Sequence, residues 1–171
     1  AMPVNLIQDD ILPYIKYIVE SFHSIAEEKN IRIHYLSSLD AMMMDYDPDI
    51  IGEVISNLLS NAVKFTPRGG NVYVQADATI ANEKVTNHSL FVNVWDTGTG
   101  IAEDKLPYIF DRFYQADDES TRKTEGTGIG LALVKEYINL LKGTIQVKSK
   151  MGKGTSFLLT LPVTHGAPMQ Q

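Results

Sequence analysis

The apolar residues in the first part of the chain recur with helical and strand periods in turn. From Asp9 to about Lys29 they stand three or four positions apart, which predicts a helix capped by the Asp9 carboxylate. Residues 4–8 precede this helix and predict a short strand. Residues 31–36 alternate between apolar and polar positions, and residues 41–46 predict another short strand.

A second helix is predicted to begin at Asp47 and Pro48. Aspartate caps the free N–H groups of a first turn, and proline is tolerated at the first helical position because its missing N–H has no partner there. Apolar residues continue at helical spacing as far as Ala62. We expect this helix to end before Pro67, which cannot continue it.

A long irregular segment interrupts the second half of the chain. Residues 96–127 are rich in glycine, proline and charge, and so long a segment in a compact domain is typical of a functional lid. From Thr164 the composition predicts a linker or a frayed end, so the predicted domain covers residues 1–163 and the tail residues 164–171. The elements expected around the lid are strands at 72–78, 90–95, 144–149 and 155–161, a polar loop at 79–89, and a helix at 128–141.

This order of elements predicts an α/β chain, and more narrowly an α+β two-layer sandwich. The expected architecture is a mixed sheet covered on one face by three helices. A chain of 171 residues with 44% apolar and 21% charged residues suits one globular domain with a full core.

Charge and composition exclude several classes of protein. The net charge of −6 argues against a nucleic-acid partner, which needs a basic face. The absence of cysteine removes disulfides and thiolate metal sites, and it fits a reducing compartment. No apolar run approaches the roughly 18–20 residues of a membrane span, so we expect no direct membrane contact.

The second helix carries a polar face that suits a cation and phosphate. Asn57, Asn61 and Lys64 stand at positions i, i+4 and i+7, so they share one side of the helix. An amide oxygen can bind Mg²⁺ while phosphate and water supply the other ligands, and lysine meets phosphate as a point charge. The alternative is an ordinary solvated helix face.

Asp96 ends an apolar strand and is followed by Gly98 and Gly100. A carboxylate at this position can accept a hydrogen bond from the exocyclic amine of adenine, whereas guanine would present an oxygen there. The glycines let the backbone approach a flat base or turn sharply. The alternative is a simple Asp-x-Gly turn after a strand.

Gly126, Gly128 and Gly130 precede the helix at 128–141, and the N–H groups of a helix N-terminus bind anions. The loop lacks the Gly-Lys-Ser/Thr of a P-loop and the strand context of a dinucleotide-binding fold. The motif set of the protein kinases is also absent. A tight turn is the alternative interpretation.

Phe110 and Phe113 flank Arg112, and we expect the aromatic pair to anchor the lid. The Arg112 guanidinium on such a lid could reach a γ-phosphate. Three further lid cations suit the same role, and the sequence does not rank them: Lys105, Arg122 and Lys123.

With these motifs in place, the chain resembles the catalytic ATP-binding domain of bacterial sensor histidine kinases. That domain has the Bergerat fold, shared with gyrase B, the Hsp90 chaperones and MutL. The resemblance covers residues 6–162. Its N, G1, F and G2 boxes and its closing glycine motif correspond to residues 57–66, 96–101, 110–114, 125–133 and 152–157.

The resemblance implies a role for each matching residue. Asn61 would bind Mg²⁺ with help from Asn57, and Lys64 would meet phosphate. Phe65 would lie beside the nucleotide and Asp96 would accept from adenine N6. The remaining nucleotide-binding residues that it implies are Gly98, Gly100, Ile101, Phe110, Gly126, Thr127, Gly128, Ile129, Gly130, Leu131 and Thr155.

The resemblance also implies a reaction: Mg-ATP donates its γ-phosphoryl group to a histidine in two-component signalling. None of the chain's histidines stands in a phosphoacceptor motif, so that histidine is expected on a separate dimerisation domain, with a response-regulator receiver domain as the next partner. The chain alone would be a monomer and the cytoplasmic portion of a membrane-bound sensor. The four histidines are His23, His34, His88 and His165.

Three further functions remain open at this point. The first is ATP hydrolysis, but ATPases of the same fold carry a glutamate at the position of Asn57 to activate water, and Asn57 cannot act as a base. Glu53, one turn earlier, could replace it only if it faced the pocket. The second function is that of a serine kinase of the anti-sigma-factor type. The third is that of a non-catalytic, nucleotide-gated interaction module.

Overall fold

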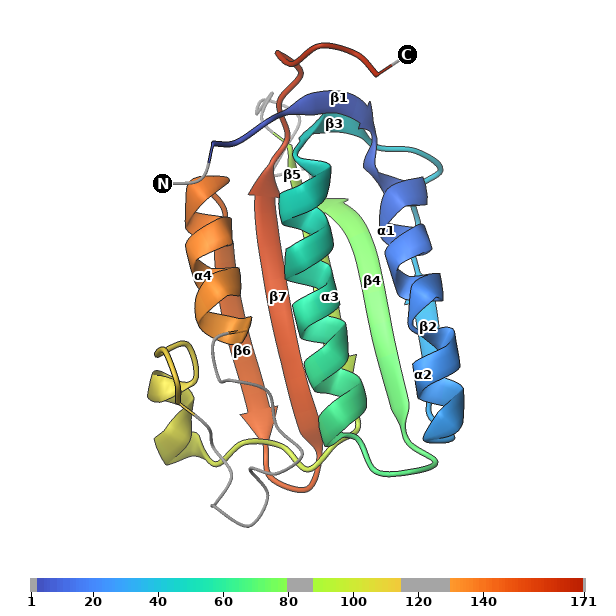
Figure 1. Ribbon diagram of the computed structural model, residues 1–171, viewed down its shortest axis with the longest axis vertical. Helices are drawn as coiled ribbons and strands as arrows, with labels where there is room; N and C mark the ends of the chain where they lie inside the picture. Colours follow the sequence, from blue (N-terminus) through green and yellow to red (C-terminus); the bar gives the residue numbers. More distant parts are fainter. Residues whose placement is uncertain (1–2, 80–87, 115–129, 171) are drawn as a thin grey trace.

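A five-stranded mixed sheet, with helices packed on one face, forms the body of the chain (Figure 1). The computed structural model describes residues 3–79, 88–114 and 130–170. Its elements, in chain order, are β1 (Ile7–Asp10), α1 (Ile11–Ser21), α2 (His23–Glu28), β2 (Arg32–Leu36), β3 (Met43–Tyr46), α3 (Pro48–Phe65), β4 (Asn71–Thr79), β5 (Ser89–Asp96), the 3₁₀ helix η1 (Glu103–Tyr108), α4 (Gly130–Leu140), β6 (Thr144–Lys150) and β7 (Gly154–Pro162).

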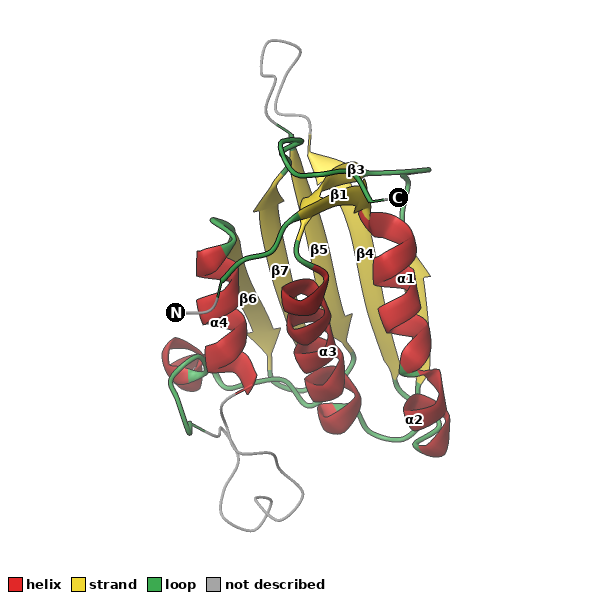
Figure 2. Ribbon diagram, turned by 45° about the horizontal axis from the view of Figure 1, so that its top comes forward, coloured by secondary structure: helices red, strands yellow, loops and turns green. Residues whose placement is uncertain are grey.

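The main sheet has the strand order β2-β4-β5-β7-β6. Strands β2 and β4 are parallel, and the other neighbours are antiparallel. Helix α1 with its continuation α2, helix α3 and helix α4 lie on the same face of this sheet (Figure 2). The predicted two-layer sandwich with a mixed sheet is confirmed.

The core lies between the sheet and the helices. Strand β5 alternates buried and half-buried residues along its whole length, so one side of the strand faces the helices. Helix α3 crosses the middle of this face (Figure 1), and Val54 and Leu59 on it are fully buried. Each such side chain contributes roughly 1.5–3 kcal/mol by leaving water. The core therefore fixes α3 against β5 and sets the direction of its polar side.

The opposite face of the sheet carries a stack of three aromatic rings. The ring centroids of His34 and Tyr73 lie 4.6 Å apart, and those of Tyr73 and Trp95 lie 4.9 Å apart. The three residues are directly paired across β2, β4 and β5, so their side chains stand side by side.

The first helix differs from the prediction at both ends. Asp10, not Asp9, is its cap, because the Asp10 carboxylate accepts from the N–H group of Leu12 in the first turn. The single helix expected as far as Lys29 is broken between α1 and α2. Ser21 lies at the break, and its hydroxyl donates to the Ile18 carbonyl at 2.5 Å, a back-bond that bends helices.

Strands β1 and β3 form a separate antiparallel ribbon, to which the C-terminal segment (residues 164–170) is attached. Gln8 in β1 bonds through its backbone to Pro168 and Gln170. Asp45 in β3 is buried and accepts from the Thr164 hydroxyl and from two backbone N–H groups, those of Gly166 and Ala167. The prediction of a frayed end is therefore wrong, because Gln8 and Asp45, which hold the segment, lie far from it in the sequence.

We expect Asp45→Ala to lower the free energy of unfolding by about 2 kcal/mol at neutral pH, because charged hydrogen bonds are lost. Burial alone would raise the pKa of Asp45, but the bonds from Thr164, Ala167 and Gly166 outweigh it and lower the pKa. This stabilisation is present above the carboxyl's unfolded pKa and is lost as pH falls through the lowered value. Urea unfolding followed by circular dichroism at several pH values measures it.

Exposed Asp40 provides the control, since Asp40→Ala is expected to leave stability within about 0.5 kcal/mol of the parent chain. A difference between Asp45→Ala and the parent chain that stayed constant down to pH 2 would contradict the role assigned to the carboxylate.

Candidate functional site

The polar side of α3 forms one wall of the candidate site. Asp47 caps the helix by accepting from the N–H groups of Asp49 and Ile50. With the apolar side of α3 buried in the core, Asn57, Asn61 and Lys64 remain half-buried on the other side, as their spacing predicts. Amide oxygens and an ammonium group therefore share one wall.

Asn57 links this wall to the start of α4. Its Nδ2 donates to the Glu53 carbonyl at 2.7 Å. A Cβ atom added to Gly130 would lie 2.8 Å from the Asn57 Oδ1, so only glycine leaves the amide in place. Gly130 is the first residue of α4. The structure thus brings together a residue of the N box and the last glycine of the glycine-rich loop.

We expect Gly130→Ala to displace the Asn57 amide with little effect on stability. The clash involves the end of a flexible side chain, and alanine favours a helix over glycine by about 1 kcal/mol. Titration with Mg-ATP should show a loss of affinity of about tenfold, the equivalent of one hydrogen-bonded contact. Exposed Gly152, with φ of +78° and nothing near its Cβ position, offers a control in Gly152→Asn, and unchanged affinity in Gly130→Ala would contradict the assignment.

Asp96 lies at the end of β5 and is 8% exposed. Its Oδ1 accepts from the Gly98 N–H at 2.8 Å and from the Thr155 N–H at 3.3 Å. Burial raises the pKa of Asp96, although these two bonds act in the opposite direction. Both bonds fall on Oδ1 and hold the carboxylate in one orientation, and none of the described residues donates a hydrogen bond to Oδ2.

Three segments pack tightly around Asp96. A Cβ atom on Gly98 would lie 2.7 Å from the Phe65 carbonyl oxygen, and one on Gly154 would lie 1.9 Å from the Asp96 carbonyl oxygen. Gly100 has φ of +78° and its backbone lies against the Lys150 carbonyl. The loop after β5 is therefore held between the end of α3 and the β6–β7 turn, with no room for side chains at these glycines.

Phe65 connects the α3 wall to the Asp96 loop. Its carbonyl accepts from the Thr99 N–H at 3.4 Å. The Lys64 ammonium lies 5.5 Å from the centroid of the Phe65 ring, within the range of a cation–π contact. The residues predicted for phosphate and for adenine are thus parts of one continuous surface.

The aromatic pair of the F box is separated in the structure. Phe110 anchors the segment as predicted, because its ring packs edge-on against Phe157 at 6.2 Å. Phe113 does not anchor it, since its side chain is 70% exposed. Phe113 has a φ of +64°, and Tyr114, which follows it, packs against the core. The expected irregular segment also contains the 3₁₀ helix η1, which precedes this box.

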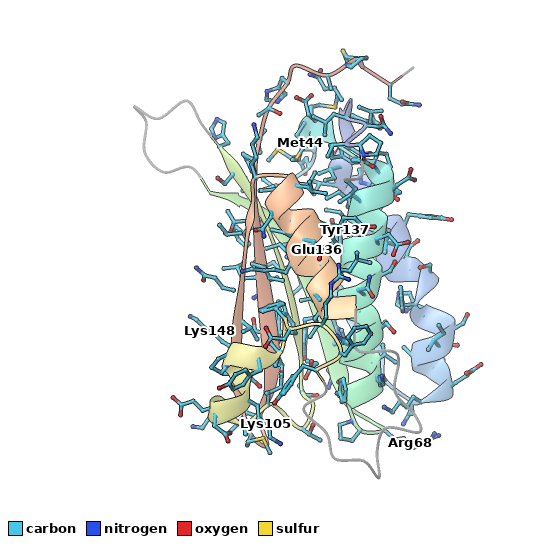
Figure 3. The ribbon with its side chains drawn as sticks, turned by 60° about the vertical axis from the view of Figure 1, so that its left-hand side comes forward. Met44, Arg68, Lys105, Glu136, Tyr137 and Lys148 are labelled. Atoms are coloured by element: carbon cyan, nitrogen blue, oxygen red, sulfur yellow. The ribbon has the colours of Figure 1, made fainter. Side chains whose placement is uncertain are left out.

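Arg112 pairs with Glu136 of α4 across the surface. The Arg112 Nη2 lies 2.7 Å from the Glu136 Oε1, and the two side chains are 62% and 51% exposed. The hydrogen bond and the charge of Glu136 raise the pKa of Arg112. Figure 3 shows Glu136 on α4 and Lys105, the other lid cation that the structure describes, farther along toward the end of β6.

Of the remaining predicted residues, Ile101 and Leu131 are described by the structure and the others are not. The backbone N–H of Ile101 donates to the Ser149 hydroxyl, and Leu131 packs against the core from the first turn of α4. The lid cations Arg122 and Lys123 lie outside the described residues, as do four of the predicted nucleotide-binding residues: Gly126, Thr127, Gly128 and Ile129.

Two residues of the site were not predicted from the sequence. Lys29 closes the C-terminal end of α3, since its ammonium donates to the carbonyls of Val63 and Lys64 at 2.9 and 2.6 Å. Burial, and then the charge of Arg68, lowers the pKa of Lys29. Ser149 in β6 contacts both the Asp96 loop and Thr155. A basic residue at the end of a predicted helix gave a weak signal for Lys29, and nothing in the local pattern marked Ser149.

The comparisons with known proteins agree on one family. The family model for histidine kinase-, DNA gyrase B- and HSP90-like ATPases matches residues 46–165, more than half of the chain. The sensor histidine kinase CusS of Escherichia coli K12 is 37% identical over 145 residues, 85% of this chain and 28% of CusS. The sensor histidine kinase WalK of Bacillus subtilis is 36% identical over 152 residues, 89% of this chain and 24% of WalK. The chain spans about a quarter of the length of these curated relatives.

Solved structures show the same fold. The crystal structure of full-length ShkA in complex with AMPPNP matches with a TM-score of 0.79 at 29% identity, covering 98% of this chain and 33% of ShkA. The catalytic domain of the histidine kinase ThkA matches with a TM-score of 0.78 at 22% identity, covering 95% of this chain and 97% of that domain. This chain therefore belongs to the family of histidine kinase-, DNA gyrase B- and HSP90-like ATPases, with the Bergerat fold of histidine kinase catalytic domains.

Proposed function

We propose that this domain binds Mg-ATP and donates the γ-phosphoryl group to a histidine on a separate phosphoacceptor domain in two-component signalling. The observation that carries the proposal is the continuous surface from Asp96, through Phe65, to Lys64, Asn61 and Asn57. It joins a buried acceptor for adenine to a polar wall of suitable chemistry for a metal-bound triphosphate.

The donor set fits Mg²⁺ held jointly with phosphate. Asn61, and Asn57 beside it, offer neutral amide oxygens, and the described residues contain no cluster of three acidic or histidine side chains that could enclose a cation. Such a site keeps several positions for water and phosphate oxygens, as Mg²⁺ prefers. When bound, the ion would neutralise charge on the β- and γ-phosphates.

The protein's own groups would mainly position the nucleotide. Asp96 orients the base, and Lys64 neutralises charge that develops on the phosphates. Phosphoryl transfer depends on such positioning and electrostatics, with little covalent chemistry by the protein. A histidine nitrogen is itself the nucleophile, so this domain needs no strong base.

The same wall argues against ATP hydrolysis as the main activity. Asn57 cannot accept a proton from water, and its Nδ2 is held by the Glu53 carbonyl. The Glu53 side chain borders a groove with Tyr14 and Gly52, one turn toward the start of α3. The ATPase alternative would require Glu53 to leave that groove for the polar wall.

The partners follow from the proposed reaction. They are ATP, the phosphoacceptor domain of the same kinase and a response-regulator receiver domain. Within the described residues, no helix has the length and apolar character needed to cross a membrane. We place this domain in the cytoplasmic portion of a membrane-bound sensor, as a monomer when separated from its dimerisation helices.

Calorimetric titration of the chain with ATP and Mg²⁺, with phosphate release followed on the same sample, tests the proposal. Saturable binding with negligible release is the expected result. Steady release at a rate typical of enzymes would favour the ATPase alternative. Failure to bind ATP, ADP or AMPPNP would overturn the proposal and favour the non-catalytic module.

A further inference from the structure

Ser149 lies at the point where the Asp96 loop meets the β6–β7 turn. Its Oγ lies 2.7 Å from the Ile101 backbone N–H, 3.0 Å from the Gly154 carbonyl and 2.7 Å from the Thr155 Oγ1. The side chain is half-buried. A single hydroxyl thus joins three segments of the chain.

The three contacts of Ser149 favour one arrangement of its proton. A serine hydroxyl has one proton to donate and two lone pairs that accept. The Ile101 N–H only donates, so Ser149 accepts from it, whereas the Gly154 carbonyl only accepts, so Ser149 donates to it. The assignment that satisfies all three contacts at once has the Thr155 hydroxyl donate its own proton to Ser149.

This arrangement fixes the hydrogen-bonding character of Thr155. With its proton directed to Ser149, the Thr155 Oγ1 offers only lone pairs to any other partner. The Thr155 backbone N–H is bonded to the Asp96 carboxylate, so the two residues are direct neighbours and their oxygen atoms gather at one corner of the site.

We propose that Ser149 is a positioning residue that sets nucleotide specificity by holding the Thr155 hydroxyl as an acceptor beside Asp96. The proposal rests on the adenine site proposed above. A 6-amino purine offers N–H donors to such a corner, whereas a 6-keto purine offers an oxygen that two acceptors repel. Without Ser149, the Thr155 proton is released and can turn to donate to the keto oxygen.

Titration with ADP and with inosine diphosphate, which has a keto oxygen at the purine 6-position and a proton on N1, tests the proposal. The parent chain should bind ADP more tightly than inosine diphosphate. We expect Ser149→Ala to reduce this preference for ADP by about three- to tenfold, the range of one net hydrogen bond. Ser149→Thr restores the hydroxyl and should restore the ratio. If Ser149 had a purely structural role, its replacement would lower the affinities for both nucleotides equally and leave their ratio unchanged.

A double variant tests whether Ser149 acts through Thr155. In Thr155→Val the hydroxyl is absent, so adding Ser149→Ala should not change the ratio further. Ser156→Ala is the matched control, because Ser156 lies on the same hairpin and its hydroxyl donates to Asn93 at 2.7 Å on the other face of the sheet.

The outcomes separate this proposal from the broader one. An unchanged ratio in Ser149→Ala, or an equal change in Ser156→Ala, would overturn the role of Ser149 while ADP binding by the parent chain still supports a nucleotide site. If the parent chain bound neither nucleotide, the proposed function itself would be overturned, together with this inference.

Discussion

Replacement of Asp96 by asparagine is expected to lower the affinity for ADP by about 100-fold or more. The substitution keeps an oxygen at Oδ1 for the N–H groups of Gly98 and Thr155, so the loop keeps its bonds. It replaces the other oxygen with an amide N–H₂ group. That group and the adenine amine are both hydrogen-bond donors, so they cannot bond to each other. Sites that bury a mismatched polar group discriminate by up to about 10⁴–10⁵. Calorimetric titration with ADP measures the loss.

The same variant should keep, or slightly raise, the stability of the domain. Burial raises the pKa of Asp96, so its stabilising contribution is complete below the unfolded pKa and is lost as pH rises through the folded value. At neutral pH the buried, ionised carboxylate lowers the stability of the folded domain, and a neutral amide removes this penalty. For the parent chain, ADP affinity should fall as pH is lowered through this raised pKa, because binding requires the carboxylate.

Asp104, an exposed residue of η1, provides the matched control. Asp104→Asn should leave both ADP affinity and stability unchanged. If Asp96→Asn bound ADP as tightly as the parent chain, the adenine site would lie elsewhere. If it unfolded the domain, the carboxylate would have a structural role that two retained bonds do not explain.

Asn61→Ala is expected to remove most of the gain in ATP affinity that Mg²⁺ provides, and to slow phosphoryl transfer by about 100-fold or more. The charge stabilisation that a metal ion supplies to a transferring phosphoryl group is worth several kcal/mol. Asn61 is half-buried on the polar wall of α3, so its removal leaves the apolar side intact. ATP titrations with and without Mg²⁺ measure the first effect. Acid-labile phosphate on a chain that includes the phosphoacceptor domain measures the second.

Asn139→Ala is the control for this variant, because Asn139 is an exposed asparagine on α4. It should leave binding and transfer unchanged. ADP binding without metal should also be unchanged in Asn61→Ala, since the base contacts are separate. A variant that kept its full Mg²⁺ dependence would exclude Asn61 as the ligand.

Local patterns were sufficient to predict the elements that surround the site. Asp47 and Pro48 mark the start of α3, and alternation in β5 marks the strand that ends at Asp96. The assignment of β1 and β3 to a ribbon outside the main sheet was not predictable, because each strand has four residues and its pairing depends on tertiary contacts.

The site itself was predictable where one short motif contains both a functional residue and the residue that orients it. Asp96 and Gly98 stand two positions apart and bond to each other. Ser149 meets Ile101 across 48 positions, and Lys29 meets the end of α3 across 34 and 35. No periodic pattern in the sequence indicates contacts between residues so far apart, so these supporting residues can be identified only from the folded structure.

The aromatic stack on the open face of the sheet supplies an optical reporter for unfolding of the central strands. Trp95 is the only tryptophan of the chain, and it precedes Asp96 on β5 while facing the other side. Its emission depends on the stack with Tyr73, so it should change when the central strands separate. Trp95 lies near one end of β5. Ser89 is at the other end of the same strand and pairs with Pro162, just before the C-terminal segment. Release of that segment by Asp45→Ala would therefore leave tryptophan fluorescence unchanged until the whole sheet unfolds.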